Sequence, residues 1–201
     1  MHLPTLRGLC IWALMALFGI STLLATTTAT NTNTVAPTLK VSATIQDAVQ
    51  LVLTTGSAGS PCAISAGSGT DYQISFGNVN GLGVGTPTCG ALNTVNGTSA
   101  QYITSYTLTA TYSGFTTYSS AAVTLTTAGF THSALLSLNE SATSGGTYTT
   151  IPSSGTTLSI ATTTSGTAIT RYLGLTVQNT NGAGAFQGAD SATVTFTLTV
   201  Q

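Results

Sequence analysis

The chain has 201 residues, a formal net charge of −1 and only 3% charged residues, against about 25% in ordinary soluble domains. Beyond residue 25 the only basic side chains are Lys40 and Arg171, which excludes a nucleic-acid partner because phosphate binding needs clusters of Lys and Arg. A surface of hydroxyls and amides favours an extracellular protein whose copies pack together, because little charge holds them apart.

Residues 1–25 have the pattern of a secretory signal peptide. Arg7 and the amino terminus supply a positive n-region, residues 9–24 are apolar, and Ala25 or Ala29 is the predicted cleavage position. A retained anchor is the alternative, but the run is near the short end of the roughly 17–25 residues that span a bilayer. The pattern therefore predicts a secreted or cell-surface protein with no membrane span in the mature chain.

Residues 26–37 are Thr- and Asn-rich and are predicted to be a flexible leader to a single domain over residues 38–201. The domain opens on residues 38–55, where apolar side chains occupy the odd positions, as in a half-buried strand. Asp47 interrupts that apolar face and predicts a bulge or kink, with residues 49–53 remaining in the core. The apolar residues before the kink are the candidate assembly strand: Leu39, Val41, Ala43 and Ile45.

Two cysteines remain once the signal is removed, Cys62 and Cys89. An even pair in an exported chain predicts one disulfide, which contributes roughly 3–4 kcal/mol in the chain-entropy model. A metal or redox pair is the weaker alternative, because there is no Cys-x-x-Cys spacing and His132 is the only histidine of the mature chain.

The rest of the chain alternates strand patterns with turn residues. Residues 79–96 are predicted to be a Gly-rich loop, and residues 139–154 a hairpin or loop around Gly145 and Gly146, where Pro152 excludes a central strand. Arg171 lies on the apolar side of its strand, so it either extends to the end of the sheet or pairs with a carboxylate. Strands are predicted at residues 62–64, 72–76, 102–112, 123–125, 136–138, 157–161, 169–177 and 192–200.

No segment has helical periodicity, and β-branched Thr and Val favour strands. About eight or nine strands separated by turn residues predict an all-β fold, a single antiparallel β-sandwich with one disulfide.

The residues of common active sites are scarce. His132 is the only candidate base, no G-x-S-x-G elbow occurs, and residues 81–85 lack the third glycine and following helix of a dinucleotide loop. The carboxylates are scattered, without acid/base or metal-ligand spacing: Asp47, Asp71, Glu140 and Asp190. The chain is therefore predicted not to be an enzyme and to need no cofactor or metal.

Some residues allow a second interpretation. Tyr102, Tyr106 and Tyr112 share one face of a strand, where packing is favoured over a carbohydrate-stacking ladder. Asn96 and Asn139 begin glycosylation sequons. Lys40 has the chemistry for an isopeptide bond to an Asn, but its position on the polar face favours a solvated lysine.

Four segments resemble bacterial secreted pilin-like and spore-coat-U-like surface domains: LKVSATIQDAVQLVLTT, YQISFGNV, ITSYTLTATYSGF and ATVTFTLTVQ. The resemblance implies an immunoglobulin-like sandwich that serves as a pilus, coat or fibre subunit, in which a strand of one subunit completes the sheet of the next. The very low charge, the long Gly-rich loop and the lack of a chaperone-recognition motif depart from that pattern.

The sequence therefore predicts a non-enzymatic structural protein that assembles by β-strand addition, with copies of itself or other surface proteins as partners. The alternative is a secreted adhesin or carbohydrate-binding module, with glycans as partners.

Overall fold

The structure is a computed structural model that describes residues 40, 42–43, 46–67, 71–114, 119–153, 155–179 and 186–201. The chain divides into two units, Met1–Thr44 and Ile45–Gln201. In the first unit Lys40, Ser42 and Ala43 are described; all three are exposed and outside regular secondary structure. The second unit contains all the described strands.

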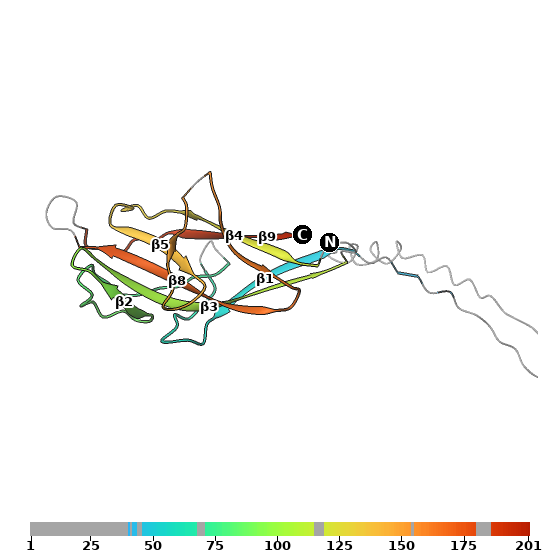
Figure 1. Cartoon of the computed structure of the whole chain (residues 1–201), viewed down its shortest axis with the longest axis horizontal. Helices are drawn as coiled ribbons and strands as arrows, with labels where there is room; N and C mark the ends of the chain where they lie inside the picture. Colours follow the sequence, from blue (N-terminus) through green and yellow to red (C-terminus); the bar gives the residue numbers. More distant parts are fainter. Residues whose placement is uncertain are drawn as a thin grey trace, which may run out of the picture. The chain divides into compact units, whose positions relative to one another are not determined.

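The second unit is an antiparallel β-sandwich (Figure 1). A six-stranded sheet has the order β1-β3-β8-β5-β6, with β2 also paired to β3, and a three-stranded sheet has the order β7-β4-β9. The predicted all-β antiparallel sandwich is confirmed, and the described residues contain no helix. The strands are β1 Ala48–Thr55, β2 Ala91–Val95, β3 Ser99–Ser113, β4 Ala121–Ala128, β5 Leu136–Ser141, β6 Thr149–Thr150, β7 Leu158–Thr163, β8 Ala168–Gln178 and β9 Thr193–Val200.

β3 is the central strand of the larger sheet and lies beside β8 in Figure 1. It also pairs with β2 near its start and with β1 near its end. Its even-numbered side chains point into the sandwich, as the sequence predicts, and most are fully buried. On the opposite sheet, Val123 and Leu125 of β4 are buried against them, so the core lies between the two sheets.

β9 has the period-2 pattern predicted for the last strand. Val194, Phe196 and Leu198 are partly buried, whereas the threonines between them are exposed. The Phe196 ring meets Tyr106 of β3 edge-on, with ring centroids 5.7 Å apart. The pattern is clear because one face of this strand packs on the core and the other faces solvent.

The predicted opening strand is shorter than expected. β1 begins at Ala48, directly after Asp47, so Asp47 precedes the strand instead of forming a bulge within it. Leu51 and Leu53 pack against the core, but Val49 is 55% exposed. The prediction that residues 49–53 lie in the core is therefore wrong at Val49. The reason is that Val49 pairs with Tyr112, near the end of β3, where the strand is no longer buried.

Two predicted strands and two predicted boundaries are wrong. Residues 72–76 form no ladder, because Gln73 bridges to Ser65 and Gly77 bridges to Pro87, two separate segments. Residues 62–64 are likewise outside any strand. The predicted loop 79–96 contains β2, and the predicted hairpin around Gly145 and Gly146 is confirmed as β5 and β6 but begins later than expected, since β5 extends to Ser141.

Candidate assembly groove

A groove of about 1510 Å³ opens on the inner face of the six-stranded sheet. Besides that face, β9 and the segment 71–82 line it, with further contributions from Phe130 and residues 186–192. The residues that the sheet contributes are mostly aliphatic: Leu51, Leu53, Tyr106, Leu136, Leu138, Leu173, Leu175 and Val177.

The groove exists because the two sheets differ in size. Three strands cannot cover the inner face of a sheet of six, so several apolar side chains are only partly buried, among them Leu136 and Leu173. β9 ends the three-stranded sheet: within the described residues it has a ladder with β4 and none on its other edge. In an antiparallel strand about half of the backbone N–H and C=O groups point to each side, so β9 presents an unpaired edge to the groove.

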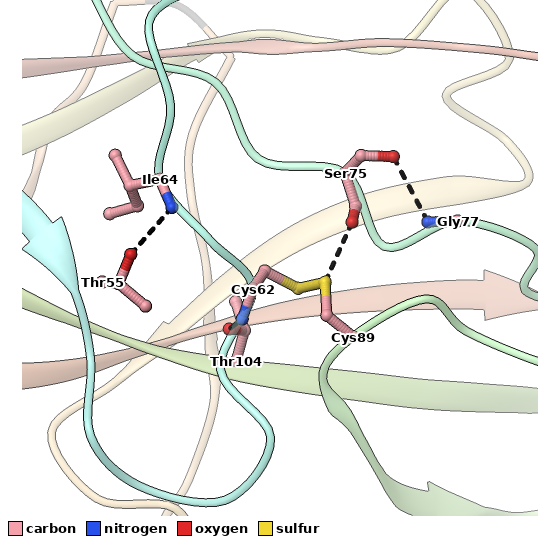
Figure 2. Close-up of a disulfide and its surroundings, with 7 residues drawn as sticks. All are labelled: Thr55, Cys62, Ile64, Ser75, Gly77, Cys89 and Thr104. Atoms are coloured by element: carbon pink, nitrogen blue, oxygen red, sulfur yellow. Dashed lines mark hydrogen bonds between the residues drawn. A yellow bond between two sulfur atoms is a disulfide. The ribbon is translucent and has the colours of Figure 1, made fainter.

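The disulfide between Cys62 and Cys89 fixes the segments that precede and follow the groove wall (Figure 2). This predicted bond is confirmed, with a Cα–Cα distance of 4.9 Å. The backbone N–H of Cys62 donates to Thr104 Oγ1 at 2.7 Å and that of Ile64 donates to Thr55 Oγ1 at 2.9 Å. The segment after β1 is thereby attached to both β1 and β3.

The wall itself, residues 71–82, is attached at three points along its length. Gln73 exchanges two backbone hydrogen bonds with Ser65 (2.9 and 3.2 Å), and the Phe76 carbonyl accepts from the backbone N–H of Thr88 at 2.8 Å. The Tyr102 hydroxyl donates to the Asn80 carbonyl at 2.9 Å. The wall is therefore held in place without forming a sheet strand of its own.

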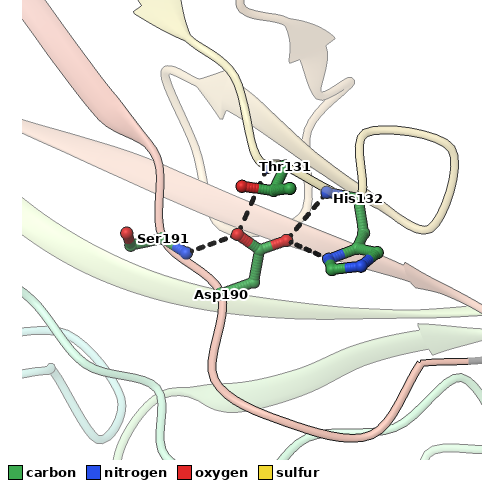
Figure 3. Close-up of polar contacts among 4 residues, drawn as sticks. All are labelled: Thr131, His132, Asp190 and Ser191. Atoms are coloured by element: carbon green, nitrogen blue, oxygen red, sulfur yellow. Dashed lines mark hydrogen bonds and ion pairs between the residues drawn. The ribbon is translucent and has the colours of Figure 1, made fainter.

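One end of the groove lining is fixed by Asp190, which joins the β4–β5 connection to the segment before β9 (Figure 3). Its carboxylate accepts from the backbone N–H groups of Thr131, His132 and Ser191 at 2.8–3.2 Å. It also accepts from Nδ1 of His132 at 2.9 Å, since an ionised carboxylate can only accept. These donors, the His132 backbone N–H foremost, lower the pKa of Asp190 to about 2.

The His132 ring stacks on Phe186, with centroids 3.7 Å apart. An aspartate paired with a histidine occurs in hydrolytic triads, but among the described residues no hydroxyl hydrogen-bonds to the second ring nitrogen of His132. The contacts that the pair does make hold two connections together.

A buried ion pair lies on the inner face of the larger sheet. Arg171 of β8 donates to both carboxylate oxygens of Glu140 of β5, Nε to Oε1 at 2.5 Å and Nη2 to Oε2 at 2.6 Å. Arg171 therefore pairs with a carboxylate, the second of the two predicted alternatives. Burial, followed by the nearby Glu140 charge, raises the pKa of the Tyr106 phenol above its ordinary value, so this third member of the cluster stays neutral.

Of the tyrosines and asparagines considered as glycan-binding or glycosylation sites, only Asn96 is exposed. Tyr102 and Tyr106 are buried and Tyr112 is partly buried, so these tyrosines cannot form the exposed ladder that glycan stacking needs. Asn139 is buried, with its amide donating to Thr176 Oγ1 at 2.8 Å, whereas Asn96 is exposed.

Of the candidate assembly strand, Leu39, Val41 and Ile45 lie outside the described residues and Ala43 is exposed. The described residues contain no group of three or more side chains suited to hold a metal ion. They also contain no helix long and apolar enough to cross a membrane.

Sequence reasoning missed the groove, because its size depends on how many strands each sheet receives. It also missed the pairing of His132 with Asp190, which are 58 residues apart and have no motif spacing.

Comparison with known proteins gives no match. No protein-family model, no curated protein and no solved structure matches the chain. Function therefore has to be inferred from the groove, the free edge of β9 and the sequence.

Proposed function

We propose that this chain is a non-enzymatic structural protein of the cell surface or extracellular matrix, a fibre or coat subunit that assembles by β-strand addition. The observation that supports it is the groove lined by apolar side chains of the larger sheet and by β9, whose second edge has no described ladder. An unpaired strand edge above apolar side chains is the arrangement that an added strand requires.

The added strand is residues 39–46 of a second copy. It is eight residues long, the same length as β9, so it can pair with β9 from end to end. Its backbone hydrogen-bonds to the free edge, and its odd-numbered side chains turn toward the aliphatic residues of the groove: Leu39, Val41, Ala43 and Ile45. The polar residues between them face solvent.

The scarcity of exposed charge favours assembly of copies of the chain. Glu140 and Arg171 neutralise each other inside the sandwich, and Asp190 is paired with His132. Because few exposed charges remain, copies of the chain approach one another with little repulsion.

The test compares two substitutions at neighbouring positions of the added strand. In chains that begin at residue 26, Val41→Asp places a carboxylate on the groove-facing side, while Ser42→Asp places the same charge on the solvent side. We expect the parent and Ser42→Asp chains to form polymers visible by electron microscopy and light scattering, and the Val41→Asp chain to form no polymer. If the parent chain is monomeric at high concentration, or if deletion of residues 26–46 leaves its assembly unchanged, the proposal is wrong.

A further inference from the structure

Four exposed aliphatic side chains gather on β2 and on the loop that precedes it. They are Leu82, Val84, Leu92 and Val95, exposed by 56, 75, 45 and 47%, and we call them the β2 patch. Gly83 joins the two segments: a Cβ built there would lie 2.4 Å from Val95 Cγ2 and 3.2 Å from Leu92 Cδ2, at a φ of +73°. The loop therefore lies directly on the Leu92 and Val95 side chains, and Leu82 and Val84 flank this point of contact.

A β-bulge creates this arrangement. Leu92 pairs with Tyr102 and Val95 with Ala100, and the register shifts between Leu92 and Thr94. Residues three apart in a regular strand point to opposite faces, but the extra residue turns Leu92 and Val95 to the same side. Period-2 analysis of the sequence cannot detect such a pair.

The patch has no charged surroundings along the chain. Residues 72–139 include no Asp, Glu, Lys or Arg, although soluble proteins commonly place charge on an exposed edge strand such as β2 to prevent association. An exposed, contiguous apolar patch without such protection is typical of an interaction site. Because it presents no charge, it has no means to select a partner of opposite charge.

We infer that the β2 patch is a lateral contact between two copies of this chain, each contributing the same four side chains about a two-fold axis. An uncharged apolar patch is complementary to itself, and a net charge of −1 gives two copies little repulsion. Four side chains are far fewer than the roughly 20 residues per side of a standard interface, so the contact is weak between free subunits. It becomes strong wherever many copies are held side by side, since each contact then forms at high effective concentration.

Leu82 also lines the groove, whereas Val84, Leu92 and Val95 do not, so the experiment tests the lateral contact at Val84 with strand addition blocked. All chains begin at residue 26 and carry Val41→Asp, which blocks the added strand, so any association that remains comes from another surface. Val84→Glu places a charge in the patch. Val49→Glu is the matched control, because Val49 is also a more than half-exposed valine but lies on β1.

Sedimentation analysis over a wide concentration range gives the dimer dissociation constant of each chain. We expect Val84→Glu to raise it about tenfold or more, as for a central apolar contact, and Val49→Glu to leave it unchanged. In a second measurement that does not depend on the stability of the Glu variant, Val84→Cys forms a covalent dimer on mild oxidation and Val49→Cys does not. Monomeric behaviour of the Val41→Asp chain at every concentration, or equal behaviour of the Val84 and Val49 variants, overturns the inference.

Discussion

The buried ion pair of Glu140 and Arg171 gives a stringent test of how the sandwich is stabilised. The two side chains are only 3% and 13% exposed and share two hydrogen bonds. Glu140→Gln leaves the Arg171 guanidinium as an uncompensated charge inside the protein, so we expect it to lower the free energy of unfolding by about 3–5 kcal/mol.

Removing both charges has the opposite consequence. Glu140→Leu combined with Arg171→Met replaces the pair by apolar side chains of similar size, and neither ion then has to lose its hydration on folding. We expect this double variant to equal the parent in stability or to exceed it by about 1–4 kcal/mol, which makes the two sites strongly non-additive.

Urea denaturation at pH 7 measures the free energy of unfolding of each variant. Asp71→Asn is the matched control: it makes the same chemical change at an exposed carboxylate, so we expect a change of about 0.5 kcal/mol or less. A loss below about 1 kcal/mol for Glu140→Gln, or a double variant as unstable as the sum of its single changes, would show that the burial of an unpaired charge does not govern stability here.

Three further predictions concern the supports of the groove. Replacing Cys62 and Cys89 by Ala should lower the free energy of unfolding by about 3.5 kcal/mol, from the entropy of a loop closed over 27 residues; a change under about 1 kcal/mol in urea denaturation would contradict this. The folded pKa of Asp190, about 2, lies below its ordinary value of 3.8, so its contribution is complete above pH 3.8 and is lost as the pH falls toward 2. Thermal unfolding of the parent should therefore weaken more steeply across this window than that of Asp190→Asn, and equal slopes would exclude the effect. Tyr102→Phe removes a hydroxyl bonded to the groove wall and should cost about 0.5–1.5 kcal/mol, whereas Tyr112→Phe, at a site near the end of β3, should be close to neutral.

Much of the fold was predictable, because strand alternation directly reports which side chains are buried. The even residues of β3 and the odd residues of β8 carry that signal, and the two cysteines beyond residue 25 leave one possible pairing. The same alternation misleads at residues 72–76. Ile74 and Phe76 do pack on the core, but the backbone of this segment bridges to two separate segments instead of one strand. Alternation reports burial and contains no information about backbone partners.

Other features are hidden for identifiable reasons. The bulge in β2 disrupts alternation, so the strand resembles a loop. In the sequence, a glutamate at position 140 suggests a turn, because a buried carboxylate is costly. Glu140 instead lies inside the sandwich on β5, because it pairs with Arg171, 31 residues away. The groove depends on a long-range property, the distribution of strands between two sheets, which no local pattern encodes.

Cross-linking between two differently labelled copies shows whether residues 39–46 of one copy pair with β9 of another. One chain carries Ser42→Cys, on the solvent side of the added strand, and the other carries a cysteine at one of the exposed β9 threonines, 193, 195, 197 or 199. If this pairing forms, mixing and mild oxidation will give a covalent heterodimer with at least one β9 position and none with Thr170→Cys, an exposed site on β8. Cross-links to Thr170→Cys as efficient as those to β9, or no heterodimer at all, would contradict it.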